Sequence, residues 1–138
     1  MGKITEELLN NIKNCDDIKD VIEENEASFL TESLKELFNK YIAEKDLKIA
    51  DIERRSGQGE YIYKVINGTR RASRDILIAI AYGMGLRLDE AQFLLRTAEA
   101  AQLNPRNKRD SVLIYGFVNK KDIYEVQEIL EELGERGF

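Results

Sequence analysis

The side chains in this 138-residue chain that could bind a ligand gather in one basic window, residues 47–74. This window carries seven Lys and Arg residues against three Asp and Glu residues, a net charge of +4. The whole chain has a net charge of −5, because residues 1–46 sum to −6, residues 111–138 sum to −3 and the remainder balances. A positive charge confined to one short stretch is expected of a localised contact with an anion such as nucleic acid.

Catalytic and metal-binding side chains are scarce. The chain has no histidine, so it lacks the imidazole base of hydrolytic triads and every His-based metal site. Its single cysteine, Cys15, can form neither an internal disulfide nor a zinc cluster, which favours a reducing, cytoplasmic location. Neighbouring carboxylates such as Asp16 and Asp17 mark no pocket, and we expect a binding protein rather than an enzyme, without metal or cofactor. No apolar stretch approaches the roughly 20 residues that span a bilayer, and no signal peptide is expected.

The basic window has the pattern of a helix, a tight turn and a second helix. KIADIERR is followed by SGQG and then by EYIYKVINGTRR. A helix-turn-helix needs a short first helix, a turn that usually contains glycine, and an amphipathic second helix. Ile62, Val65 and Ile66 give the second helix, over about residues 59–67, one apolar face. We expect this helix to enter the major groove of double-stranded DNA, where Gln can pair with adenine and Lys with guanine.

Two groups of side chains in the window are candidates for DNA contacts. The first, at the start and on the polar face of the second helix, would read base edges: Gln58, Glu60, Tyr61 and Lys64. The second, at the start of the first helix and around the end of the second, would hold phosphates: Lys48, Tyr63, Asn67, Thr69, Arg70 and Arg71. Tyr61 and Tyr63 could equally be half-buried core residues, and Arg54 and Arg55 could simply suit a helix end.

Helical periodicity dominates the remaining sequence and predicts an all-α fold. Apolar residues from Leu34 to Ile42 recur at helical spacing, with Thr31 or Ser33 as the N-cap. Further helices fit the same pattern between capping residues and glycines: roughly 48–55, 59–67, from Ser73 to Gly85, 88–101, 105–118 and 122–133. Pro105 suits a first helical turn, and Asp122 with Glu125 forms a capping box. The helix after Gly85 begins near either Arg87 or Asp89.

Two stretches of the sequence are similar at an offset of 35 residues. Residues 74–95 align with residues 109–130, with coincident Arg74/Arg109, Asp75/Asp110, Glu90/Glu125, Gln92/Gln127 and Leu95/Leu130. The similarity indicates either an internal repeat or two amphipathic helix pairs that resemble each other by patterning alone. In both cases we expect two αα-hairpins of similar geometry. The Arg-Asp pairs themselves are typical of helix starts.

Residues 33–101 resemble the Cro/repressor-type (XRE-type) helix-turn-helix domain. The resemblance is carried by the Ser56-Gly57 turn, YIYKVING, the TRR loop and SRDILIAIAYGMGL followed by DE. RRSG, NGTRRASRD and NPRNKRDSVLIYG are similar, more narrowly, to small bacterial regulators with an acidic N-terminal arm and a C-terminal helix pair. The general resemblance covers about half of the chain and implies a five-helix bundle that binds operator DNA, usually as a dimer, and regulates transcription.

The start of the second helix departs from that family. Gln58-Gly59-Glu60 stands where Ser, Arg or Asn residues are common, and the turn is one residue shorter. Gly59 should lower the stability of this helix by up to about 1 kcal/mol relative to Ala. Glu60 is unfavourable near phosphates unless it accepts a hydrogen bond from cytosine N4 or is neutralised by Arg54 or Lys64. These departures support a second hypothesis: the protein is a non-catalytic adaptor or inhibitor that binds a protein partner through a degenerate helix-turn-helix surface.

The expected organisation is one compact unit in three parts. Residues 1–30 form an acidic helical arm, residues 31–103 the DNA-binding domain and residues 104–138 a helical hairpin packed on it. The apolar stripe of that hairpin is the expected surface of a homodimer: Val126, Ile129, Leu130 and Leu133. The opposite charges of the arm and the basic window suggest that the arm shields the DNA face when no DNA is bound.

Overall fold

The computed structural model describes residues 9–10, 13–14, 19 and 30–138. Between residues 30 and 138 it forms seven helices and no strand: α3 Leu30–Glu44, α4 Ile49–Ser56, α5 Tyr61–Ile66, α6 Arg74–Gly83, α7 Leu88–Thr97, α8 Lys108–Val118 and α9 Ile123–Glu132. The fold is all-α, as predicted. The predicted acidic arm, residues 1–30, and with it Cys15, Asp16 and Asp17, falls almost wholly outside the described residues.

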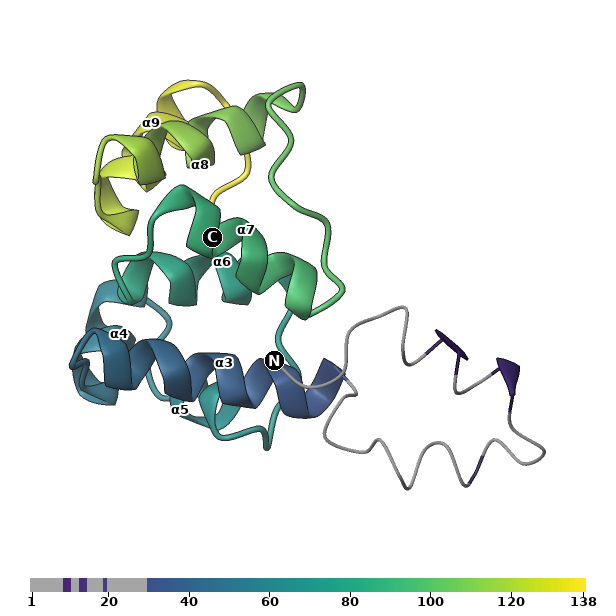
Figure 1. Ribbon diagram of the computed structural model, residues 1–138. Coiled ribbons are helices and arrows are strands. Elements are labelled where there is room, and N and C mark those ends of the chain that lie inside the picture. The colour runs from purple at the N-terminus through teal and green to yellow at the C-terminus, as the bar shows by residue number, and fades with distance from the viewer. Residues whose placement is uncertain (1–8, 11–12, 15–18, 20–29) are drawn as a thin grey trace.

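The helices stack in three tiers (Figure 1). The α3, α4 and α5 helices form one end, α6 and α7 the middle, and α8 and α9 the other end. The middle tier is therefore covered on both sides, and α6 is buried along most of its length, from Leu77 to Gly83. The apolar core runs through all three tiers, from Phe38 of α3 to Leu130 of α9. No helix among the described residues is both long and apolar enough to cross a membrane.

Several helix ends follow the capping residues predicted from sequence. Gly57 ends α4 in the left-handed conformation, with φ +72°. The Ser73 hydroxyl accepts a hydrogen bond from Ile76 N at the start of α6. Asp122 and Glu125 form the predicted capping box, with Glu125 N donating to Asp122 Oδ1 over 2.8 Å. Side-chain caps of this kind satisfy backbone donors that the first helical turn leaves free.

Other predicted boundaries are wrong. Pro105 precedes α8, because Asn107 supplies the cap and the helix begins at Lys108. Thr31 and Ser33 lie inside α3, which already begins at Leu30. The start of α7 at Leu88 agrees with Arg87 rather than Asp89, since Arg87 N donates to the Glu90 carboxylate. The helix ends at Thr97 rather than near residue 101, and Glu99 follows with φ +58°.

The 35-residue similarity is a structural repeat of two hairpins, α6–α7 and α8–α9. Arg74 Nε donates to Ala101 O in the first hairpin. The same hydrogen bond recurs 35 residues later in the second, where Arg109 Nε donates to Arg136 O. Gln92 binds the backbone of Leu103, and Gln127 accepts from Phe138 N. Positive φ angles recur as well, at Gly85 and Lys120 and at Glu99 and Gly134. Patterning alone would not reproduce these specific hydrogen bonds, so the two hairpins are copies of one unit.

The two copies bind each other reciprocally. Arg74 pairs with Asp110 through two hydrogen bonds of 3.1 and 2.8 Å, while Arg109 pairs with Asp75 at 3.0 Å. The equivalent rings of Tyr82 and Phe117 stack with centroids 4.0 Å apart. Contacts in which each copy offers the same residues to the other define an approximate two-fold relation. The Arg-Asp pairs lie at helix starts, as predicted, and they also join the two hairpins, which the sequence did not predict.

The buried centre of this interface explains two further residues. Tyr82 donates to Leu113 O over 2.6 Å, and burial raises the pKa of its hydroxyl well above the usual range. Gly116 leaves room for Tyr82, since an added Cβ there would collide with the Tyr82 hydroxyl and with Val126. Val126 and Leu130 are fully buried in this core. They therefore cannot belong to a dimer surface, and only Ile129 and Leu133 of the predicted stripe reach solvent.

Candidate nucleic-acid interface

The segment predicted as a helix-turn-helix consists of α4, the turn Gly57–Glu60 and α5. The second helix begins at Tyr61 and ends at Ile66, so it is shorter than the predicted 59–67. Gly57 and Gly59 both have positive φ, +72° and +65°. A residue with a side chain is strained in this conformation, and the turn needs both glycines. Gly59 is therefore part of the turn, and the prediction that it weakens the helix is wrong.

The α4 helix is anchored closely on α6. Ile52 and Ser56 are fully buried, and the Ser56 hydroxyl donates to Glu53 O within α4. Gly83 of α6 lies so near that an added Cβ would be 2.7 Å from Ile52 O. The far end of α4 also touches the last tier, where the Tyr124 hydroxyl of α9 donates to Arg54 O over 2.9 Å. The helix before the turn is thus fixed from two sides.

The α5 helix packs with one face and presents the other. Ile62, Val65 and Ile66 are buried, as the amphipathic pattern predicts. Lys64 is exposed, and Tyr63 is 50% exposed. Tyr63 therefore does not belong to the core, which was the alternative to a DNA contact. The presented face of α5 therefore carries one cation and one aromatic ring.

The loop after α5 is held by its own side chains. Asn67 Oδ1 accepts from Thr69 N and from the Thr69 hydroxyl, and the Lys64 carbonyl accepts from the backbone of Thr69 and Arg70. The Tyr61 hydroxyl donates to Arg71 O over 2.9 Å, and the Arg70 guanidinium lies 5.6 Å from the Tyr61 ring centre. Three of the predicted contact residues, Tyr61, Asn67 and Thr69, thus shape the loop that presents Arg70 and Arg71.

The two remaining predicted residues, Gln58 and Glu60, precede α5 and differ in exposure. Gln58 is partly buried in the turn, and its backbone N–H donates to the Ser56 hydroxyl. Glu60 is exposed in the position before α5. Of the two ways in which Glu60 could be tolerated near phosphates, neutralisation by Arg54 or Lys64 is not seen: Arg54 pairs with Asp51 at 3.1 Å, and no ion pair joins Lys64 to Glu60. Glu60 leaves one uncompensated negative charge beside the cations.

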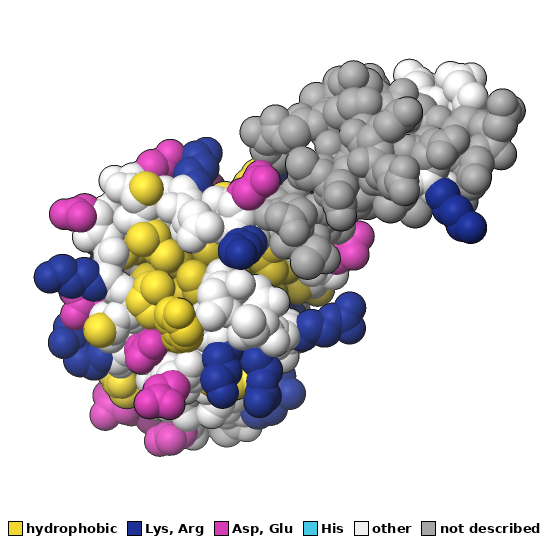
Figure 2. All heavy atoms as spheres, turned by 90° about the horizontal axis from the view of Figure 1, so that it is seen from below, with side chains coloured by type: hydrophobic (Ala, Val, Ile, Leu, Met, Phe, Trp, Pro, Cys, Tyr) yellow, Lys and Arg dark blue, Asp and Glu magenta, His cyan; other side chains and the backbone are white. Residues whose placement is uncertain are grey.

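Most cations around α4 and α5 have no acidic partner among the described residues. Residues 30–73 contain nine Lys and Arg residues, of which three are in ion pairs: Lys40, Lys45 and Arg54. Among the described residues, the other six lie beyond 4.0 Å from any carboxylate: Lys35, Lys48, Arg55, Lys64, Arg70 and Arg71. Figure 2, viewed from the side of α3 and α5, shows Lys and Arg side chains, interspersed with Asp and Glu, around a hydrophobic patch. We name these six residues the cationic face.

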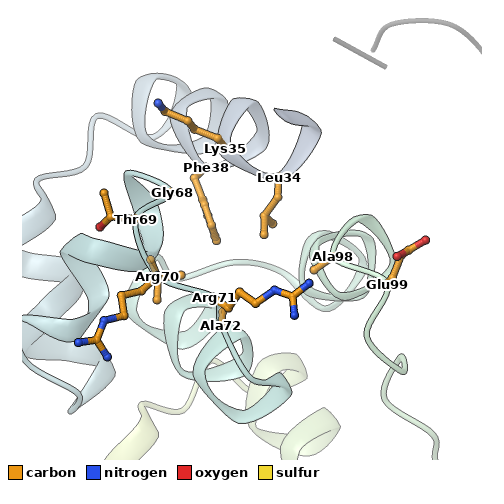
Figure 3. A pocket seen from close by; sticks show the side chains of 11 residues that line it. Leu34, Lys35, Phe38, Gly68, Thr69, Arg70, Arg71, Ala72, Ala98 and Glu99 are labelled. Atoms are coloured by element: carbon orange, nitrogen blue, oxygen red, sulfur yellow. The ribbon is translucent and has the colours of Figure 1, made fainter. Parts of the chain in front are cut away.

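A hollow of about 420 Å³ lies beside the loop that follows α5 (Figure 3). Leu34 and Phe38 point into it from α3, and Ala98 closes it from the end of α7. The Arg71 side chain extends along the hollow towards Ala98, whereas Arg70 points away from it. Arg71 is therefore the cation that connects the cationic face to this hollow.

Two members of the cationic face, Lys35 and Arg55, were missed as contact residues from sequence. Lys35 comes from α3, outside the basic window, and only the fold brings it beside Gly68, where a Cβ would lie 3.8 Å from it. Arg55 lies at a helix end, where a basic residue is favourable in any case, so its charge alone predicts no contact.

Comparisons with protein-family profiles, curated proteins and solved structures find no match to this chain.

Proposed function

We propose that this protein is a sequence-specific, double-stranded-DNA-binding regulator of transcription, in which α5 enters the major groove and the protein acts as a dimer. The helices α3 to α7 would form the five-helix, repressor-like domain to which the sequence bears a resemblance. The proposal uses α4 and α5 in the roles of a helix-turn-helix, with α4 held against α6 and α5 presented to solvent.

The observation that carries the proposal is the absence of acidic partners for the cationic face within the described residues. A desolvated or closely paired cation has little to gain from a phosphate, whereas an unpaired exposed cation can replace a condensed counterion. The six cations come from α3, from both ends of α4, from α5 and from the following loop. Such a set suits a duplex whose phosphates run along both sides of the groove.

The contact roles within this proposal follow the exposure of each side chain. Arg70, Arg71, Lys48 and Lys35 would hold phosphates, while Lys64 and Tyr63 would face the groove from α5. Gln58 and Glu60 would meet base edges at the start of α5, where Glu60 could accept a hydrogen bond from cytosine N4. Tyr61 would position the loop rather than read a base, because its hydroxyl is already bonded to Arg71 O.

Genome-wide mapping of bound sites tests this function directly. The proposal expects enrichment of a limited set of sites that share one sequence motif, and loss of that enrichment in an Arg70→Glu, Arg71→Glu variant. Enrichment that is equal for both proteins, or no enrichment at all, would contradict it.

Glu60 favours one alternative, a non-catalytic adaptor or inhibitor that binds a protein through the same face. An exposed carboxylate at the start of α5 repels phosphate but can pair with a basic partner. In that case a Glu60→Gln substitution would weaken partner binding, whereas for a DNA-binding protein it should increase non-specific DNA affinity because a negative charge is removed.

A further inference from the structure

One apolar face of the last hairpin, α8–α9, is open to solvent. Three side chains of this hairpin are 46–62% exposed, and two more are partly buried: Tyr115, Val118 and Leu133, with Ile114 and Ile129. We name these five residues the terminal face. Large apolar side chains that gather at a protein surface commonly mark an interaction site.

The repeat shows what the equivalent face does in the first hairpin. Val118 corresponds to Gly83, which lies against Ile52 and Ser56 of α4. Leu133 corresponds to Ala98, which lines the hollow together with residues of α3. Tyr115 corresponds to Ile80, which is fully buried. In the first copy this face is therefore covered by the α3 and α4 helices, whereas in the second copy nothing among the described residues covers it.

The side chains of the terminal face are larger than their buried counterparts. Gly83 and Ala98, which allow helices of the same chain to approach closely, are replaced by Val118 and Leu133. Ile80 is replaced by Tyr115, and tyrosine is enriched in protein–protein interfaces. The exchange retains an apolar surface where a purely solvent-facing helix would carry polar residues.

The charges of the two helices indicate which partner fits this face. In residues 108–121, which comprise α8 and its following turn, Arg109 and Asp110 are buried and pair within the chain, so the accessible charge is the +3 of Lys108, Lys120 and Lys121. Residues 122–132, which comprise α9 and its cap, carry five acidic and no basic side chains, a net charge of −5. A two-fold pairing that sets α8 of one chain against α9 of another joins these opposite charges twice. The two hairpins of one chain already pack crosswise in this way, α6 with α9 and α7 with α8.

We propose that the terminal face binds the terminal face of a second copy of this chain, with α8 of each protomer against α9 of the other. This inference rests on the proposed function, because two recognition helices placed one turn of DNA apart require two copies of the chain. Its test uses no DNA, so failure of the dimer and failure of DNA binding can be told apart.

Sedimentation equilibrium of the full chain without DNA tests the proposal. Wild-type protein should be a dimer, and Tyr115→Glu and Val118→Glu should each raise the dimer dissociation constant roughly tenfold or more. Both positions are exposed, so circular dichroism should show unchanged helix content. Tyr63→Glu is the matched control, since Tyr63 is as exposed as Tyr115 but lies on α5, and it should leave the dimer intact.

A charge exchange tests the crosswise arrangement. Lys120→Glu and Glu132→Lys should each weaken the dimer, and the double variant should recover most of the wild-type affinity. Neither side chain has an ion-pair partner among the described residues, so each exchange leaves the internal ion pairs intact.

Two results would overturn the inference. The first is a monomeric wild-type protein; hydroxyl-radical footprinting would then show whether Tyr115 is nevertheless protected, as it would be if residues 1–29 covered the face. The second is a dimer that both Tyr115→Glu and Val118→Glu leave unchanged, which would place the interface elsewhere.

Discussion

The two halves of the described chain carry the same number of basic side chains and use them differently. Residues 30–73 and residues 74–138 each contain nine Lys and Arg residues. Six of the nine in the second half are in ion pairs, several of which join the two hairpins, whereas six of the nine in the first half are not. Most cations of the second half therefore form ion pairs within the chain, whereas most cations of the first half have no carboxylate partner among the described residues. Charge-changing substitutions should therefore act on binding in one half and on stability in the other.

The largest effect is expected from reversing two cations of the first half. Arg70→Glu with Arg71→Glu should lower the affinity for double-stranded DNA roughly 100-fold or more, because each reversal removes a phosphate contact and adds repulsion. The midpoint of urea unfolding should hardly change, since neither side chain is in an ion pair. Fluorescence anisotropy with a labelled duplex measures the affinity.

The matched control is Arg96→Glu with Arg106→Glu, which reverses two exposed and unpaired cations of the second half. It should leave DNA affinity within about threefold of wild type, since these cations lie outside the cationic face. Equal losses in both double variants would mean that net charge, rather than this face, sets the affinity.

A smaller effect, on stability alone, is expected from removing an internal partner in the second half. Asp110 is buried, and its carboxylate accepts hydrogen bonds from Arg74 Nη1, Arg74 Nη2 and Asn104 N. Asp110→Ala should lower the free energy of unfolding by about 3 kcal/mol, because it leaves a guanidinium without its partner. Asp75→Ala should cost a comparable amount, about 3 kcal/mol, because it leaves the buried guanidinium of Arg109 without a carboxylate, although Asp75 itself is partly exposed. Urea denaturation followed by circular dichroism measures both losses, and a cost below about 1 kcal/mol for either variant would contradict a stabilising role of the reciprocal pairs.

The turn between α4 and α5 provides a prediction of about 1 kcal/mol. Gly59→Ala should destabilise the protein by that amount, because φ is +65° and alanine is strained there. No atom lies within 4 Å of the added Cβ, so the loss would come from the backbone alone. Thermal unfolding measures it. If Gly59→Ala instead stabilises the protein, Gly59 belongs to the helix, as the sequence predicted, and not to the turn.

The smallest expected effect separates positioning from reading. Tyr61→Phe removes the hydroxyl that donates to Arg71 O and should weaken DNA binding about threefold, the value of one partly exposed hydrogen bond. The loss should be the same for every duplex sequence, because the hydroxyl positions the loop. Competition binding with single-base variants of the preferred site would reveal a base-specific loss, which would make Tyr61 a reading residue instead.

Local signals predicted the fold well where one residue determines one feature. The Gly57 end of α4, the Ser73 cap of α6 and the Asp122–Glu125 box are each decided by backbone hydrogen bonds within a few residues. Pro105 and Gly59 were misplaced because each is compatible with a helix start and with the turn before it. Only the competing cap at Asn107 and the second positive φ at Gly59 decide between these.

The candidate site was predictable in composition but not in the division of roles. The basic window contains five of the six cations of the cationic face, and Lys35 joins them only through folding. Tyr61, Asn67 and Thr69 resemble ligand-binding residues in sequence, yet the structure gives each an internal hydrogen bond. The reciprocal pairs Arg74–Asp110 and Arg109–Asp75 depend on the packing of one hairpin against its copy, which spacing alone cannot reveal.

The most direct test of the central claim, that the cationic face binds DNA, is the dependence of duplex affinity on salt concentration. Each neutralised phosphate contributes about −0.9 to the slope of log affinity against log salt, so the four phosphate contacts proposed for Lys35, Lys48, Arg70 and Arg71 predict a slope of about −3.6 per protomer. The Arg70→Glu, Arg71→Glu variant should reduce the steepness by about two. A wild-type protein that fails to bind at low salt, or a variant whose slope equals that of the wild type, would contradict the account.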